Sequence, residues 1–198
     1  MTIYLVRHGE TDWNALGRIQ GHTDIPLNAK GIEQAQALIP IVRRLNIKSV
    51  LASDLSRAQE TARIVTQELD LKINTDSRLR EANMGEAEGM KNADMLEKYG
   101  HDSLHAWRSN SREHLSYSFP GGETGYEVLD RVTDALAHYS EFLESPVLVV
   151  SHGGSIRRIL QNALNKSENS FWVPNGVVFP VNFSSETGEI ELILDLPL

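Results

Sequence analysis

Three short apolar runs constrain the fold more than any other feature of this 198-residue chain. They are IYLV at 3–6, SVLA at 49–52 and VLVVS at 147–151. The runs are rich in β-branched residues and do not alternate between apolar and polar positions. Strands of a parallel sheet that is covered on both faces have this character, so the runs predict such a sheet.

Helical patterns occupy the stretches between and after these runs. A helix is expected over about Ala29–Leu45, with Pro40 introducing a kink or a break. TGYE at 124–127 has the Thr-x-x-Glu form of a capping box. Ser53 is expected to cap another helix, whose apolar face comprises Leu55, Ala58, Ala62, Val65 and Leu69.

The rest of the chain completes an α/β pattern. A further helix should follow SHGG at 151–154, and GVVFPVNF at 176–183 and EIELIL at 189–194 read as two antiparallel strands. The fold class expected is therefore a three-layer α/β sandwich around a mainly parallel sheet with an antiparallel edge. We expect one domain over 1–198.

Residues 90–119 fit this alternation poorly and carry several aromatic and basic side chains. They are interpreted as an insertion of short helices that caps the site. The alternative is a solvated excursion with no role in binding.

Composition limits the partners. The formal net charge is −8, which argues against nucleic-acid binding, because a basic surface supplies most of that affinity. The chain has no cysteine, so disulfides and thiolate metal sites are excluded. The first ten residues lack a signal-peptide pattern, and no apolar run approaches the roughly 18 residues of a membrane span. Cytoplasmic localisation is the default expectation.

Polar and charged residues directly follow each of the three apolar runs. Ligands of open α/β sheets bind at the carboxyl ends of the strands, so we expect these residues to meet there. The last set also opens a helix, whose first N–H groups favour an anion. Arginine forks match phosphate oxygens, so the set predicts a phosphate pocket. Its members are Arg7 and His8, then Ser53, Asp54 and Arg57, then His152, Gly153 and Gly154.

Phosphoryl transfer also needs a nucleophile and a proton donor. A neutral His8 imidazole can attack phosphorus, and arginines can neutralise the phosphoryl oxygens without a metal. Glu81, in LREANMGEAEG, is the candidate proton donor. Spacing alone leaves Glu86 and Glu88 open as alternatives.

Five ordered segments carry a family resemblance: LVRHGET with DWN, LASDLSRAQETA, LREANMGEAEG, PGGET and VLVVSHGGSIRRIL. Together they resemble the histidine phosphatase superfamily, which has the phosphoglycerate-mutase-like fold. The resemblance spans about Ile3 to Leu160. It implies that His8 is the phosphorylated nucleophile and Glu81 the proton donor, and that phosphate is bound by Arg7, Asn14, Gln20, Arg57, His152 and Gly153.

The resemblance also bears on the reaction. Thr11 and the short interval of 70 residues between Glu81 and His152 favour the compact phosphatase branch over the mutases. Met84 and Ala87 stand where relatives often have aromatic residues, which leaves substrate specificity open. The expected substrate is a small phosphorylated metabolite, with phosphoglycerate mutase or α-ribazole phosphate phosphatase activity as alternatives. No cofactor is expected, and a homodimer would be in keeping with the family.

Two other classes of function compete with this interpretation. One is a metal-dependent hydrolase with His8 and His152 as ligands, joined by His22 or Glu81. The two nearby arginines oppose it because they would repel a cation. The other is a phosphate-binding module without turnover, which the presence of Glu81 opposes. Glu10 is expected to orient the turn or a neighbouring cation and has no catalytic role.

Overall fold

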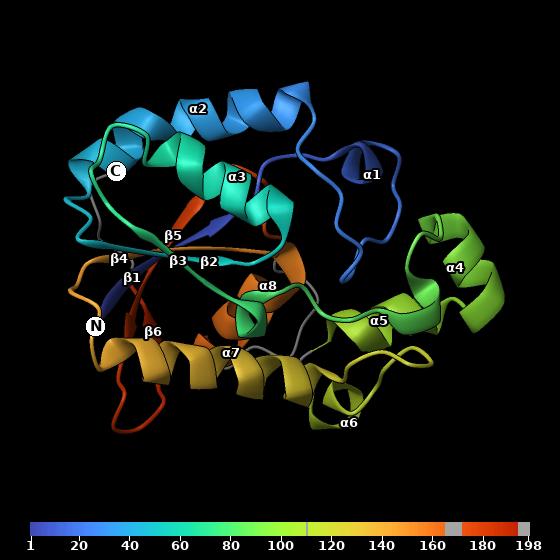
Figure 1. Ribbon diagram of the computed structural model, residues 1–198. Helices are drawn as coiled ribbons and strands as arrows, with labels where there is room; N and C mark the ends of the chain where they lie inside the picture. Colours follow the sequence, from blue (N-terminus) through green and yellow to red (C-terminus); the bar gives the residue numbers. More distant parts are fainter. Residues whose placement is uncertain (110, 165–171, 194–198) are drawn as a thin grey trace.

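The computed structural model describes residues 1–109, 111–164 and 172–193 (Figure 1). Its centre is a six-stranded sheet with the order β3-β2-β4-β1-β5-β6. The first four strands in this order pair in parallel, and β5 and β6 are antiparallel. The strands are β1 (Thr2–Arg7), β2 (Ser49–Ser53), β3 (Ile73–Asp76), β4 (Val147–Ser151), β5 (Val178–Phe183) and β6 (Ile190–Leu192).

This architecture confirms the expected fold class, including the antiparallel edge. The sequence did not predict β3, which pairs in parallel with β2. This strand is short, polar and only partly buried, so it contains no apolar run. The expected strand at 189–194 ends earlier, at Leu192, and Leu194 lies outside the described residues.

Helices cover both faces of the sheet (Figure 1). Successive residues of β1 show why its sequence does not alternate. Tyr4 and Val6 pack into the cluster that includes α2 (Ala29–Arg44) and α3 (Ser56–Val65). Ile3 and Leu5 pack into the cluster that includes α7 (Gly125–Ser140) and α8 (Gly153–Ala163). Because both faces of the strand are buried, both sets of side chains are apolar.

Helices α2 (Ala29–Arg44) and α3 (Ser56–Val65) lie on one face. Helix α2 has the expected extent but continues through Pro40, so the expectation of a break is wrong. Pro40 and Gln36 are both exposed. Water can therefore bond the Gln36 carbonyl that loses its N–H partner, while burial of the opposite face holds the helix together.

The expected cap of α3 is wrong. Ser53 is the last residue of β2, and Leu55 occupies the N-cap without a side-chain hydrogen bond. The chain needs two further residues to leave the sheet before it can turn into the helix. Asp24, from a distant loop, accepts from the Ser56 backbone N–H at 2.9 Å and serves this helix end instead.

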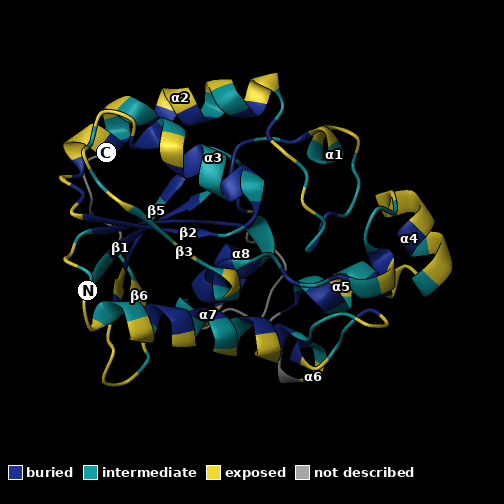
Figure 2. Cartoon of the chain, in the orientation of Figure 1, coloured by how far each residue is buried: buried dark blue, intermediate teal, exposed yellow. Residues whose placement is uncertain are grey.

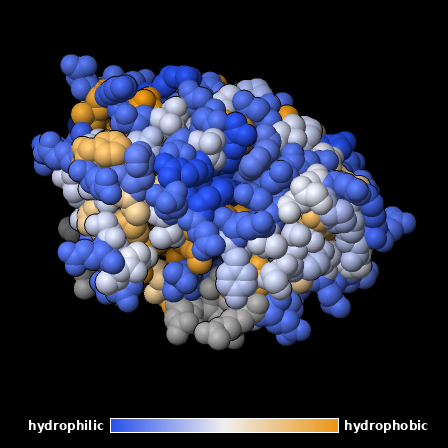
Figure 3. All heavy atoms as spheres, turned by 60° about the horizontal axis from the view of Figure 1, so that its bottom comes forward, coloured by the Kyte–Doolittle hydropathy of each residue, from blue (hydrophilic) through white to orange (hydrophobic). Residues whose placement is uncertain are grey.

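On the other face, α7 (Gly125–Ser140) begins with the expected capping box of Thr124 and Glu127. Helix α8 (Gly153–Ala163) follows β4 directly and begins at the His152 segment. The face shown in Figure 3 is largely hydrophilic. Within the described residues, no helix has the length and apolar character needed to cross a membrane.

Three short helices lie beyond the end of the sheet, on the same side of the molecule as the short α1 (Asp12–Ala15) (Figures 1 and 2). They are α4 (Asn92–Tyr99), α5 (Asp102–Arg108) and α6 (Arg112–Leu115). Met95, Trp107 and Phe119 form an apolar cluster there with residues of the Glu81 segment. The segment therefore packs through buried apolar side chains.

Candidate active site

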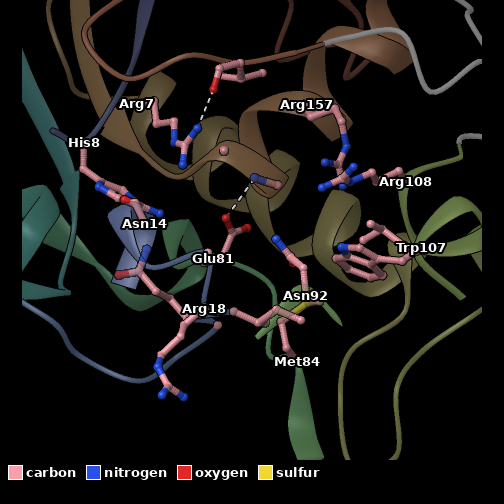
Figure 4. Close-up of a pocket in the computed structure, with 18 of the residues that line it drawn as sticks. Arg7, His8, Asn14, Arg18, Glu81, Met84, Asn92, Trp107, Arg108 and Arg157 are labelled. Atoms are coloured by element: carbon pink, nitrogen blue, oxygen red, sulfur yellow. Dashed lines mark hydrogen bonds between the residues drawn. The ribbon is translucent and has the colours of Figure 1, made fainter. Parts of the chain in front are cut away.

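The carboxyl ends of the central strands lie level with one another. Arg7 pairs with Ser151 across β1 and β4, and Ala52 pairs with Val150 across β2 and β4. This register brings the residues that follow the strands to one edge, as the sequence predicted. A cavity of about 240 Å³ opens there (Figure 4).

His8 is buried, and its Nδ1 lies 2.7 Å from the Gly9 carbonyl oxygen. A carbonyl can only accept, so Nδ1 carries the proton and Nε2 keeps its lone pair. Burial lowers the pKa of His8 well below its usual range, and the charges of Arg57 and Arg7 add to the effect. His8 is therefore neutral near pH 7, in the tautomer that a nucleophile needs.

His152 lies against His8, with the ring centroids 5.1 Å apart. Arg57 donates from Nε to Nδ1 of His152 at 3.2 Å. Because Nδ1 accepts, the ring proton of neutral His152 is on Nε2, which is buried and has no partner in the described structure. Burial, followed by the charge of Arg57, lowers the pKa of His152 well below its usual range.

Backbone carbonyls hold the fully buried Arg57 side chain. Its Nη1 donates to the Thr23 oxygen at 2.8 Å, and its Nη2 donates to the Gly21 oxygen at 2.9 Å. Burial lowers the pKa of Arg57 to about 10, so it stays protonated at neutral pH. The loop over 20–24 thus orients one cation of the site.

Arg7 is the second cation. Its Nη1 donates to the Val173 carbonyl oxygen at 2.7 Å, whereas its Nε is buried and unpartnered among the described atoms. A Cβ on Gly153 would lie 3.1 Å from that Nε, so glycine lets the start of α8 approach the guanidinium closely. The sequence predicted Arg7 and Gly153 at one site, and the structure brings them into contact.

Asn14 and Gln20 also line the cavity. The backbone N–H of Thr11 donates to Oδ1 of Asn14 at 3.2 Å, and the hydroxyl of Thr11 donates to Oε1 of Gln20 at 3.0 Å. With both amide oxygens held, both NH₂ groups are available as donors to an anion. Thr11 is fully buried and orients both amides, a role that the sequence did not indicate.

Glu81 lines the cavity at the N-terminus of α8. Its Oε2 accepts from the Gly154 N–H at 2.9 Å, and its Oε1 accepts from the N–H groups of Ala82 at 2.9 Å and Ser155 at 3.2 Å. Neither Glu86 nor Glu88 lines the cavity. Glu86 pairs with Lys98 on the surface, and Glu88 accepts from the loop over 22–23.

Gly154 makes the position of Glu81 possible. A Cβ there would lie 2.3 Å from Oε1 of Glu81, which is closer than any real contact. The sequence indicated that two glycines would let the backbone approach an anion. Gly153 lies against Arg7 and Gly154 lies against the carboxyl group of Glu81, and the approach of this backbone to a phosphate stays a prediction.

A second set of contacts fixes the backbone of the Glu81 segment. Arg131, on α7, donates to the carbonyl oxygens of Arg78, Arg80 and Glu81 at 2.7 to 2.9 Å. Glu123 binds the other side of the same guanidinium at 2.7 and 2.9 Å. Glu123 belongs to the PGGET segment, which the sequence singled out without giving it a role.

The turn after β1 rests on the start of α2. Glu10 accepts from Lys30 Nζ at 2.9 Å and from Asn28 Nδ2 at 3.2 Å, and these bonds lower its pKa. The backbones of Gly9 and Gly31 lie in close contact, because a Cβ on Gly9 would lie 2.3 Å from the Gly31 oxygen. Glu10 therefore holds the turn and the cation of Lys30, as expected, and it does not line the cavity.

The far wall of the cavity is built partly by the segment over 90–119, which the sequence predicted as a cap over the site, and partly by residues that the sequence did not indicate. It comprises side chains from α4, α5, α8 and two neighbouring loops. In Figure 4, Trp107, Arg108 and Arg157 lie opposite Arg7, His8 and Asn14, with Glu81 between the two sides, and Arg18 lies next to Asn14 at one end of the wall. Its described members are Arg18, Met84, Asn92, Leu104, Trp107, Arg108 and Arg157.

Donor atoms that the metal-site hypothesis requires are already engaged in hydrogen bonds. Nδ1 of His152 accepts from Arg57, and both oxygens of Glu81 accept from backbone N–H groups. Across 1–109, 111–164 and 172–193, no three His, Cys, Asp or Glu side chains gather as a metal site would require.

Comparison with known proteins identifies the family. The sequence model of the "Histidine phosphatase superfamily (branch 1)" matches residues 3–195. The chain belongs to the histidine phosphatase superfamily. Membership confirms the expectation of an enzyme of the phosphoric monoester hydrolase class.

This histidine phosphatase has curated and structural relatives with different names. "Probable phosphoglycerate mutase GpmB" of Salmonella choleraesuis (strain SC-B67) is 43% identical over 159 residues, which cover 77% of this chain and 70% of the relative. The α-ribazole phosphatase of Shigella flexneri has a TM-score of 0.78 at 29% identity, covering 98% and 95% of the two chains. The mycobacterial glucosyl-3-phosphoglycerate phosphatase Rv2419c, in complex with VO3, has a TM-score of 0.84 at 25% identity, covering 98% and 97%.

Proposed function

We propose that this histidine phosphatase hydrolyses small phosphomonoesters without a metal, through a phosphohistidine on His8. The observation that carries the proposal is the hydrogen bond from His8 Nδ1 to the Gly9 carbonyl, which leaves Nε2 as the free lone pair. Arg7 and Arg57 line the same cavity and would neutralise the phosphoryl oxygens. Neutral His152, with its proton on Nε2, would donate a further hydrogen bond.

In the first step, Nε2 of His8 attacks phosphorus. The P–N bond forms as the P–O bond to the alcohol breaks, and Glu81 gives a proton to the leaving oxygen. In the second step, Glu81 takes a proton from water, which attacks phosphorus and breaks the P–N bond. Inorganic phosphate leaves and His8 returns to its starting state.

The direct test is to trap the intermediate. Rapid quenching after mixing with a ³²P-labelled ester should yield labelled protein whose label survives base and is lost in acid. His8→Ala should abolish the label and lower kcat by about 10³-fold or more. His101→Ala, at an exposed position outside the cavity, is the matched control and should retain both.

Turnover by His8→Ala near the wild-type rate would overturn this mechanism. Activity should also survive EDTA, and loss of activity on removal of a stoichiometric metal would favour the metal-dependent alternative. A screen in which no phosphomonoester releases phosphate would favour the binding module.

Phosphoglycerate mutase activity is the second candidate, because the curated relative that is 43% identical carries that name. The two activities differ in where the phosphoryl group goes, to water or back to a phosphoglycerate. Interconversion of 2- and 3-phosphoglycerate, stimulated by a bisphosphoglycerate and faster than phosphate release, would move the chain to the mutases. A substrate panel that includes α-ribazole phosphate ranks the hydrolytic alternatives.

A further inference from the structure

Arg157, on α8, is a partly buried cation, and two of its nitrogen atoms lack a hydrogen-bond partner in the part of the chain that the structure describes. Its Nε and Nη2 are shielded from solvent and have no hydrogen-bond partner among the described residues, and the side chain lines the cavity. Burial lowers its pKa to about 9, with a further contribution from Arg158, so it is protonated at neutral pH. An unpaired charge that is shielded from water is destabilising, so these nitrogen atoms indicate a binding site for an anion.

Arg108 lies on the same wall, and its backbone is held firmly. Gln161 Nε2 donates to its carbonyl oxygen at 3.1 Å. Arg158 donates to the carbonyl oxygens of the residues on either side, Trp107 and Ser109. Two side chains of α8 thus fix the end of α5, and Figure 4 shows the guanidinium groups of Arg108 and Arg157 directed toward one another.

The charge of the cavity exceeds what one phosphoryl group requires. Arg7 and Arg57 lie on the His8 side and match a phosphoryl dianion. Glu81 is the one carboxylate among the described lining residues, and its oxygens already accept from backbone N–H groups. Within the described structure, neither Arg108 nor Arg157 forms an ion pair with a carboxylate. Of the remaining lining cations, Arg18 donates to the Gly89 carbonyl oxygen, whereas Arg108 and Arg157 remain for a second anion.

We propose that Arg157 and Arg108 form a subsite for a second anionic group on the substrate, a carboxylate or a phosphate carried by the alcohol part of the phosphomonoester. The inference rests on the proposed hydrolytic function and narrows its substrate class. Trp107 and Asn92, on the same wall, would contact the carbon chain that joins the two anionic groups.

The experiment compares esters that differ only in the second charge. 3-Phosphoglycerate and glycerol 3-phosphate test a carboxylate against a hydroxymethyl group, and 1,3-propanediol bisphosphate and 3-hydroxypropyl phosphate test a second phosphate. The quantity measured is the ratio of kcat/KM for the charged ester to that for its neutral partner. Charge-assisted hydrogen bonds should make at least one ratio about 10 to 100.

Variants assign the preference to the subsite. Arg157→Met and Arg108→Met keep side-chain length and should reduce the ratio to about 1, whereas Arg157→Lys should restore part of it. Arg44→Met removes one positive charge at an exposed position of α2 and should leave the ratio unchanged. Salt should lower the ratio in the wild type and not in Arg157→Met.

Calorimetric titration of the same ester pairs into His8→Ala gives the comparison as a ratio of affinities, without turnover. Hydrolysis or binding of neutral and charged esters with equal efficiency would overturn the subsite and leave the phosphohistidine mechanism standing. An equal loss on both esters in Arg157→Met would also overturn it, because Arg157 would then support the pocket as a whole. Absence of a labelled phosphoenzyme would contradict the proposed phosphohistidine mechanism and would leave the second-anion subsite standing.

Discussion

At the scale of single residues, backbone groups orient the reactive atoms. The Gly9 carbonyl sets the tautomer of His8, and the carbonyls of Gly21 and Thr23 hold Arg57. The N–H groups at the start of α8 hold Glu81. A backbone group is fixed by the fold, so the geometry of the site is sensitive to changes that move the backbone or fill the space beside it.

Gly154→Ala tests this dependence. The new Cβ would lie 2.3 Å from Oε1 of Glu81, so the carboxyl must move, and a displacement of about 1 Å can cost about 10²-fold in kcat. We expect a loss of this size in steady-state kinetics. Alanine has a higher helix propensity than glycine. The substitution should therefore lower the midpoint of thermal unfolding by less than overpacking of a buried core would.

A double-mutant cycle provides the control. If Gly154→Ala acts through Glu81, it should have little further effect on kcat in a Glu81→Ala background. Additive losses in the two backgrounds would contradict the assignment.

At the scale of elements, α7 supports the site from behind. Arg131 bonds three carbonyls of the Glu81 segment, and Glu123 holds Arg131. Although burial acts to raise it, the pKa of Glu123 is lowered by its hydrogen bonds with Arg131 and the Asn83 N–H. The pair is a positioning device, since neither side chain lines the cavity.

Arg131→Met should therefore change both stability and rate. It leaves three carbonyls and a partly buried carboxylate without their donor, which should cost about 2 to 4 kcal/mol of unfolding free energy in urea titrations. Because Glu81 loses its fixed place, kcat should fall about 10-fold or more, and the pH dependence of kcat should shift. Arg63→Met, at an exposed position on α3, is the matched control and should change neither quantity.

Sequence patterns predicted the residues that follow buried strands, because parallel strands must deliver them to one edge. His8, Arg57 and His152 meet for that reason, and capping chemistry predicted the start of α7 at Thr124. The roles of Thr11, Arg131 and Arg157 could not be predicted. Each depends on contacts between segments far apart in the chain, and no local pattern encodes such contacts.

At the scale of the whole molecule, the buried histidines couple stability to pH. His8 and His152 have folded pKa values well below the unfolded value of about 6.5. Below pH 6.5 the unfolded chain binds protons that the folded protein does not, so the free energy of unfolding falls as the pH decreases. The loss continues until the pH reaches the lower folded pKa values.

Urea unfolding in phosphate-free buffer should show this loss between pH 6.5 and 5.5. The slope should approach about 1.4 kcal/mol per pH unit for each of the two histidines. His152→Gln should halve it, and His101→Gln, at an exposed position, should not. Stability that rises on acidification through this window would contradict the coupling.

Helix α8 has a consequence for the size of substrate that the enzyme can accept. Gly153, at its first position, contacts Arg7, which we propose binds the phosphoryl group, and Arg157 lies four residues further along. A helix rises 1.5 Å per residue, so the two binding positions are offset by about 6 Å along one rigid rod. The rise of α8, rather than the flexibility of a loop, would therefore set the separation between the two anionic groups of a substrate that binds at both positions.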